Sequence, residues 1–140
     1  MNWFLWALMA AGIWGFVPLL EKYGLAKTEP MVGIFFRCLG IVFGFLMMTL
    51  FFIRPHHIKS VDIRSALCLI AGGFLASFVA QIAFYNSLKL GEMSRVVPIS
   101  ASYPLIVFLL GVIVLHESFT LPKFLGGILI VLGIWLLKIG

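Results

Sequence analysis

Long hydrophobic runs, separated by short polar clusters, dominate the sequence. The runs lie at residues 3–20, 31–53, 65–88, 96–115 and 121–137. Their apolar residues follow one another without the alternation of a membrane β-strand. Because a backbone in lipid has to satisfy its own polar groups, each run predicts a helix, and about 20 apolar residues are enough to cross a bilayer. The pattern therefore predicts an all-α integral membrane protein, with five transmembrane helices in one domain over residues 1–140.

Composition narrows the class of protein further. Hydrophobic residues make up 63% of the chain and charged residues 11%, whereas soluble domains have about 45–50% and about 25%. The basic residues are spread singly, which argues against a nucleic-acid partner. Because the sequence holds no Ser/His/Asp arrangement, phosphate loop or metal-ligand spacing, we expect no enzyme, cofactor or metal site. Cys38 and Cys68 lie in apolar runs without a CxxC pair, so both are expected to be small buried hydrophobic residues.

Charges and tryptophans mark the ends of the first run. Glu21 and Lys22 close it and, with residues 27–30, are expected to form the first connection. No small-residue cleavage pattern follows the run, which indicates a retained span rather than a removed signal peptide. Trp3 fits an aromatic belt at the membrane surface. Trp14 lies in the middle of the run, where it either packs against a neighbour or lines a solute pathway.

Positive charges are nearly balanced between the two sides of the predicted helices. Four lie on the N-terminal side: Arg54, Lys59, Arg64 and Lys123. Five lie on the other side: Lys22, Lys27, Lys89, Arg95 and Lys138, and Arg37 would make six. A clear excess normally sets one orientation, so near-balance suggests insertion both ways and an inverted pair, like the inverted repeats of many transporters. The alternative is that one loop dominates and fixes the orientation.

The few polar side chains inside the runs are the candidates for a solute pathway. Arg37 either faces a polar pathway that attracts anionic groups, or serves as an interfacial anchor or an intramolecular ion pair. Ser77, Gln81 and Tyr85 recur at every fourth residue and so share one helix face. That face is either the wall of a pathway or a seam of interhelical hydrogen bonds. Gln81 and Tyr85 favour the pathway, and Ser77 favours the seam.

The fourth run carries two prolines, Pro98 and Pro104, and each tends to kink a helix because it removes a backbone N–H. Pro98 is expected in the first turn, where proline is harmless, and Pro104 at a true kink. Kinked helices in transporters often mark the binding site. We therefore expect Ser102 and Tyr103, which precede Pro104, to line the solute pathway.

Two further patterns concern coupling and packing. No Asp or Glu lies in the middle of a run, and the nearest candidates for a proton relay are Glu21 and Glu117 at helix ends. Gly72, Ala76 and Ala80 recur at four-residue spacing, which predicts close helix packing within one chain or between chains.

Several short motifs follow one another in a particular order. They are residues 7–15 followed by Lys22, then Pro30 and Phe36-Arg37, residues 83–88, Val97-Pro98, Tyr103-Pro104-Leu105, and residues 115–118 followed by 126–133. In this order and spacing they resemble the EamA-type domain of the drug/metabolite transporter superfamily, in its short branch with one five-helix repeat.

The resemblance implies a fold and a function. Such proteins form a ten-helix basket of two inverted five-helix repeats around a central cavity, and they export amino acids, nucleotide-related metabolites or drugs. A chain with one repeat would act as an inverted homodimer or with a related partner, by alternating access, in the plasma membrane of a bacterium or archaeon. The alternatives are a half-transporter or non-transporting subunit that needs a different five-helix partner, and a lipid-headgroup flippase.

In such a transporter, the candidates from the spans would line the cavity: Trp14, Gln81, Tyr85, Ser102 and Tyr103. The resemblance itself assigns roles to two residues. Arg37 and Glu117 are the signature charges, and Glu117 is expected to be structural, at the turn between the fourth and fifth helices. Position 116 is His where the family usually has a small residue.

Overall fold

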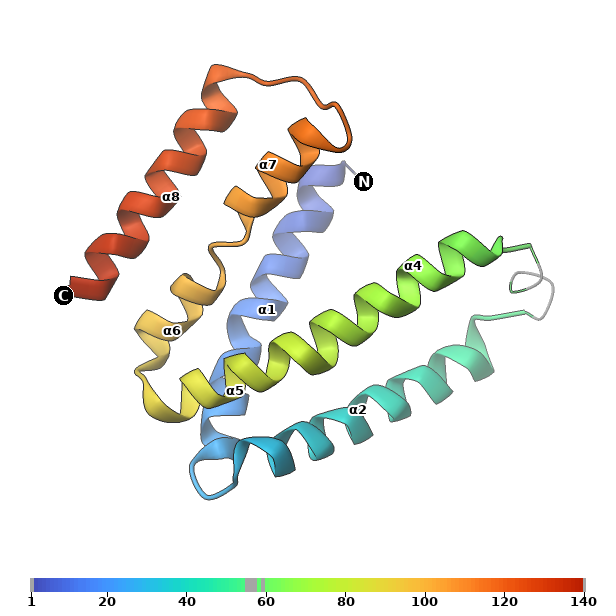
Figure 1. Cartoon of the computed structure of the whole chain (residues 1–140). Helices are drawn as coiled ribbons and strands as arrows, with labels where there is room; N and C mark the ends of the chain where they lie inside the picture. Colours follow the sequence, from blue (N-terminus) through green and yellow to red (C-terminus); the bar gives the residue numbers. More distant parts are fainter. Residues whose placement is uncertain (1, 55–57, 59, 140) are drawn as a thin grey trace. The chain divides into compact units, whose positions relative to one another are not determined.

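The computed structural model describes residues 2–54, 58 and 60–139. All regular secondary structure in these residues is helical (Figure 1). Five stretches are long and apolar enough to cross a membrane. These observations confirm the all-α membrane fold that the hydrophobic runs predicted. Lys59, one of the four basic residues counted on the N-terminal side, lies outside the described residues.

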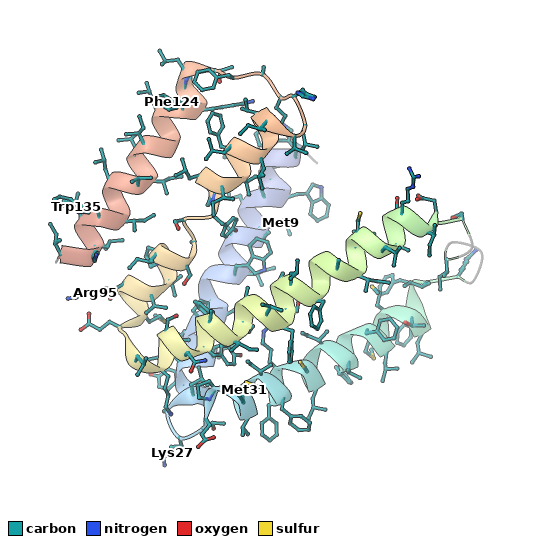
Figure 2. All side chains as sticks on the ribbon, in the orientation of Figure 1. Met9, Lys27, Met31, Arg95, Phe124 and Trp135 are labelled. Atoms are coloured by element: carbon teal, nitrogen blue, oxygen red, sulfur yellow. The ribbon has the colours of Figure 1, made fainter. Side chains whose placement is uncertain are left out.

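Other parts of the chain leave most side chains of the five spans uncovered, and Figure 2 shows these side chains projecting around the helices. Such exposure is expected where lipid, rather than protein, covers apolar side chains. Cys38 is half-buried and Cys68 is exposed. The prediction that both cysteines are buried is therefore wrong, because the structure leaves Cys68 exposed and covers Cys38 only in part.

The chain divides into two compact units, Met1–Lys89 and Leu90–Gly140. The first unit holds three spans, and the third of these is built from two α-helices joined by a π-helical turn. Its elements are α1 (Trp3–Leu25), α2 (Pro30–Phe51), α4 (Ile63–Phe74), the π-helical turn η1 (Leu75–Val79) and α5 (Ala80–Leu90).

Helix α1 continues past the predicted end of the first run, so that Glu21 and Lys22 lie inside the helix and not in the connection. Glutamate and lysine are both good helix formers, and both side chains find partners within the unit. The starts of α2 and α4 carry residues that are typical of helix N-termini. Pro30 occupies the first position of α2, and the Asp62 carboxylate caps α4 by accepting a hydrogen bond from the Ser65 N–H at 3.0 Å.

Two lysines tie the C-terminal ends of α1 and α5 together. Lys22 on α1 donates to the carbonyl of Leu88 on α5, and Lys89 on α5 donates to the carbonyl of Leu25 on α1. The last carbonyls of a helix have no partner within the helix, so each lysine satisfies the end of the other helix. Leu25 and Leu88 are 2% and 0% exposed. The small core of the first unit therefore lies at this end.

The second unit holds the last two spans. The fourth span consists of α6 (Met93–Ser100) and α7 (Pro104–Ile113), and the fifth is α8 (Leu121–Ile139). Both α6 and α7 contact α8. The α7–α8 contact is close at Gly127, where an added Cβ would lie 3.1 Å from Cδ1 of Leu105.

One of the two prolines of the fourth span lies elsewhere in its helix than expected. Pro98 lies inside α6, whereas Pro104 is the first residue of α7, where a missing N–H costs nothing. The interpretation of Pro98 as a first-turn proline is therefore wrong. The helix is interrupted at residues 101–103, and Pro104 contributes to the interruption because it has no N–H to donate back into the preceding turn.

Candidate functional site

A carboxylate on α1 is the centre of a polar cluster in the first unit. The Oε1 atom of Glu21 accepts hydrogen bonds from Gln81 Nε2 at 3.1 Å and from Tyr85 Oη at 3.0 Å. Arg37 Nε lies 3.5 Å from the same oxygen and forms an ion pair with it. Three donors from two other spans therefore converge on one oxygen atom.

The π-helical turn positions the arginine of this cluster. Arg37 lies about 10 Å along α2 from its start, and its Nη1 donates to the Ser77 carbonyl at 3.1 Å. Ser77 lies within η1, and π-helical turns occur frequently at functional sites. Ser77 thus contributes a backbone carbonyl to an interhelical bond, which is consistent with the predicted seam although its hydroxyl is not the group used.

A glycine on α2 makes room for the tyrosine. A Cβ added at Gly33 would lie 2.8 Å from Leu25 Cδ2 and 3.2 Å from Tyr85 Cε2, closer than real Cβ contacts normally come. The Tyr85 ring therefore packs directly against the α2 backbone, and this contact brings its hydroxyl to Glu21. Sequence analysis missed Gly33, because a single glycine near a helix start carries no signal of its own.

An open cleft of about 490 Å³ adjoins the cluster. Its polar lining comes from Glu21, Thr28, Arg37 and Tyr85, and apolar side chains such as Leu20 and Phe36 also line it. The Glu21 side chain is 11% exposed and that of Arg37 is 29% exposed, so both charges are shielded yet border the cleft. A shielded pair of opposite charges beside an apolar cleft can hold the polar groups of a solute.

The structure brings together three of the six predicted pathway residues. Arg37, Gln81 and Tyr85 meet at Glu21, although Gln81 and Tyr85 are more than 40 residues from Arg37 in the sequence. Glu21 was expected in a connection, and its only sequence signal was a carboxylate placed directly after an apolar run. Trp14 lies on α1, is 65% exposed and is not among the residues that line the cleft.

The other two predicted pathway residues belong to the second unit. Ser102 and Tyr103 lie in the interruption between α6 and α7, where Ser102 is half-buried and Tyr103 is 52% exposed. Their assignment to a solute pathway stays a prediction.

The connection between α7 and α8 contains the predicted signature charge. The backbone N–H of Glu117 donates to the Gly111 carbonyl at 3.0 Å. The carboxylate of Glu117 lies over Gly111, where an added Cβ would approach it to 3.2 Å. His116 has a φ of 53°, a left-handed conformation that favours glycine, which explains why a small residue would suit this position. The contacts of Glu117 are those of a residue that shapes the turn.

Metal ligation has no support among the described residues, because no three His, Cys, Asp or Glu side chains gather there in a way that could hold an ion.

Comparison with known sequences places this geometry in context. The EamA-like transporter family matches residues 1–139. An uncharacterized transporter of Archaeoglobus fulgidus is 25% identical over 133 residues, which cover 95% of this chain and 47% of that protein. The chain thus spans about half the length of this relative. An uncharacterized transporter of Sinorhizobium sp. is 28% identical over 141 residues, with 99% and 97% of the two chains covered.

A further relative, an uncharacterized protein of Methanocaldococcus jannaschii, is 29% identical over 135 residues, with 94% and 93% of the two chains covered. No solved structure matches the chain.

Proposed function

The chain belongs to the EamA-like transporter family and is a multi-pass membrane transporter. We propose that it exports a small solute through the cleft beside Glu21 and Arg37. One observation carries the proposal. Charged side chains within membrane spans are costly, and they usually face a cavity or a partner that has a function. Here both charges of an ion pair border a cleft of about 490 Å³.

The proposed mechanism is alternating access between two five-helix repeats of opposite orientation in the plasma membrane. The Archaeoglobus relative is about twice as long as the matched region, which is the length that two repeats in one chain would have. The near-balance of basic residues on the two sides favours two copies of this chain, inserted in opposite directions, as the equivalent arrangement. The second copy would supply the other half of the solute pathway.

The export proposal is tested by measuring solutes outside cells that produce the protein. We expect the wild type to raise the external level of at least one small metabolite, and Glu21→Gln and Arg37→Gln to abolish the rise at equal membrane abundance. Glu92→Gln is the matched control, because Glu92 is an exposed carboxylate with a side chain 71% exposed. External metabolites that do not differ between wild type and the two cleft variants would refute the proposed site.

The inverted dimer is tested separately by orientation. Reporters that are active only in the cytoplasm or only outside it are fused after Gly140, and both are expected to give signal. Signal from one reporter alone would exclude the inverted homodimer, and a different five-helix partner of opposite orientation would then complete the transporter.

A further inference from the structure

Another cleft lies in the second unit, where the fourth span begins and the fifth span ends. This α6–α8 cleft has a volume of about 410 Å³ and is lined by Glu92, Ser94, Arg95, Leu136 and Leu137. Figure 1 shows the start of α6 and the end of α8 at the same end of this unit, and the two helices contact each other. Each of the two spans has the length needed to cross a bilayer, so their ends reach the membrane surface. The cleft therefore lies where lipid headgroups meet their acyl chains.

Positive charge predominates at the polar side of the α6–α8 cleft. Arg95 lines the cleft, and Lys138 follows Leu137 in the last turn of α8, whereas Glu92 is the one carboxylate among the described residues that line it. The first N–H groups of a helix have no partner within it and give that end partial positive charge. Within the described residues, the Glu92 side chain makes no capping hydrogen bond to those of α6. A guanidinium, the Ser94 hydroxyl and backbone N–H groups therefore lie close enough together to bind one anion.

The carboxylate of Glu92 does not prevent Arg95 from binding such an anion. Arg95 Nε lies 3.1 Å from Glu92 Oε2, and both side chains are exposed. An exposed ion pair contributes little to stability, so Arg95 can exchange this carboxylate for a better acceptor at low cost. The planar guanidinium carries five N–H donors and matches the geometry of a phosphate group, which it can bind through two parallel hydrogen bonds. A phosphate is therefore the anion that suits Arg95 best.

The other side of the α6–α8 cleft is apolar. Leu136 and Leu137 line it and are exposed within the chain, as is Trp135 beside them. Figure 2 shows Trp135 and Arg95 at the same end of the second unit, and tryptophan is enriched where a membrane meets water. A soluble phosphate ester would leave the two leucines uncovered. A phospholipid would cover them with an acyl chain while its phosphate group reaches Arg95.

We propose that the α6–α8 cleft binds an anionic phospholipid of the membrane, with the phosphate against Arg95 and the start of α6 and an acyl chain along Leu136 and Leu137. Lys138 and the partial positive charge of the α6 terminus disfavour a headgroup that carries a cation of its own. The bound lipid joins the fourth span to the fifth. The described residues that line this cleft differ from those of the cleft beside Glu21, so the proposal does not rest on the proposed function.

Native mass spectrometry of the purified protein, with lipids added in detergent micelles, tests the class of lipid. Phosphatidylglycerol, phosphatidylcholine and diacylglycerol with the same acyl chains have an anionic headgroup, a zwitterionic headgroup and no phosphate. We expect one saturable phosphatidylglycerol per chain. It should bind at least about tenfold more tightly than diacylglycerol, which lacks the hydrogen bonds between charged groups, and more tightly than phosphatidylcholine. Equal binding of the three lipids would show contact with acyl chains alone and would overturn the proposal.

Glycerophosphoglycerol distinguishes a lipid from a soluble phosphate ester, because it has the headgroup of phosphatidylglycerol without the acyl chains. We expect that it does not displace phosphatidylglycerol from the protein when both are present at the same concentration. Displacement under these conditions would identify a soluble phosphate ester as the ligand, and would overturn the assignment of a lipid.

Two substitutions at the exposed ion pair are expected to change lipid binding in opposite directions. Arg95→Gln should lower the affinity for phosphatidylglycerol about tenfold, and Glu92→Gln should raise it, because the carboxylate that competes for Arg95 is removed. Arg64→Gln is the matched control, since Arg64 is also an exposed arginine in the first turn of a helix, α4. Unchanged binding in Arg95→Gln, an equal loss in Arg64→Gln, or a loss in Glu92→Gln would overturn the proposal.

Thermal unfolding in the same detergent gives a second measurement. Because the lipid contacts both α6 and α8, phosphatidylglycerol is expected to raise the unfolding temperature of the wild type more than diacylglycerol does. This difference between the two lipids should disappear in Arg95→Gln, whose unfolding transition without added lipid shows that the variant is folded. A difference that persists in Arg95→Gln would place the lipid elsewhere on the protein and overturn the proposed site.

Discussion

The Glu21–Arg37 pair in the first unit and the Glu92–Arg95 pair in the second join the same chemical groups in different surroundings. The first pair links α1 to α2, and its side chains are 11% and 29% exposed. The second lies at the start of α6 and joins two residues that are three positions apart. Its side chains are 71% and 44% exposed. A shielded pair positions helices and is costly to break, whereas an exposed pair of this kind contributes little.

The same difference extends to the two units as a whole. In the first unit, polar side chains join helices across separations of 40 to 66 residues, from Arg37 to Ser77 and from Lys22 to Leu88. In the second unit, contacts such as Lys123 with Ser118 are local, and the helices meet at glycines such as Gly127. We infer that long-range polar contacts of side chains hold the first unit together, and that apolar packing such as that of Leu105 against Gly127 holds the second.

The largest expected effect comes from removing one half of the shielded pair. Glu21→Leu leaves the Arg37 guanidinium without its counter-charge, and we expect a loss of roughly 3 kcal/mol in the free energy of unfolding. Thermal or denaturant unfolding in lipid nanodiscs measures it. The double variant Glu21→Leu/Arg37→Leu is expected to recover much of the loss, because no unpaired charge remains. Glu92→Leu, at the exposed pair, is expected to cost less than about 1 kcal/mol, and a similar loss for both single variants would refute the comparison.

A somewhat smaller effect is expected at the glycine that accommodates Tyr85. Gly33→Ala forces Leu25 or Tyr85 to move, and we expect a loss of about 1–3 kcal/mol in stability. Gly40→Ala is the matched control on the same helix, because an added Cβ there meets no atom within 4 Å. Alanine is the better helix former, so Gly40→Ala should keep or raise stability. Equal stability of the two variants would show that the close approach at Gly33 does not matter.

A substitution in the turn after α7 is expected to raise the stability of the protein instead of lowering it. His116→Gly relieves the left-handed backbone conformation at a φ of 53°, and we expect stability to rise by about 1 kcal/mol. Ser118→Gly in the same connection has no such strain to relieve and is expected to lower stability slightly. Unfolding of both variants in the same nanodiscs provides the measurement, and a loss of stability in His116→Gly would show that its side chain has a role that the backbone geometry does not reveal.

The smallest expected effect is the pH dependence of the α4 cap. The hydrogen bonds of Asp62 with Ser65 hold the pKa of the Asp62 carboxyl below its ordinary value of 3.8. A lowered pKa means that the stabilisation is complete above the ordinary value and is lost as the pH falls through the lowered one. The amides at the start of α4 should therefore lose protection against hydrogen exchange in the wild type below this range, when each measured rate is compared with the intrinsic rate at the same pH. Asp62→Asn keeps a capping acceptor that does not titrate and should show no such change.

The number and type of the spans could be predicted from the sequence because both are local properties. Uninterrupted apolar runs of about 20 residues have to form helices in lipid, whatever packs against them. The sequence also identified Arg37, Gln81 and Tyr85 as polar groups that need an explanation, since a polar side chain inside a span is costly wherever it lies.

Tertiary structure decided which of these groups meet. Glu21 became the centre of the cluster only because α1 continues by another turn and α5 packs beside it, 60 residues later in the sequence. The Ser77 carbonyl accepts a hydrogen bond from Arg37 and belongs to a π-helical turn. The recurrence of polar residues at every fourth position did not indicate this turn. The physical reason is that a charge in a membrane requires a partner, and its own neighbours in the sequence do not specify which distant helix supplies one.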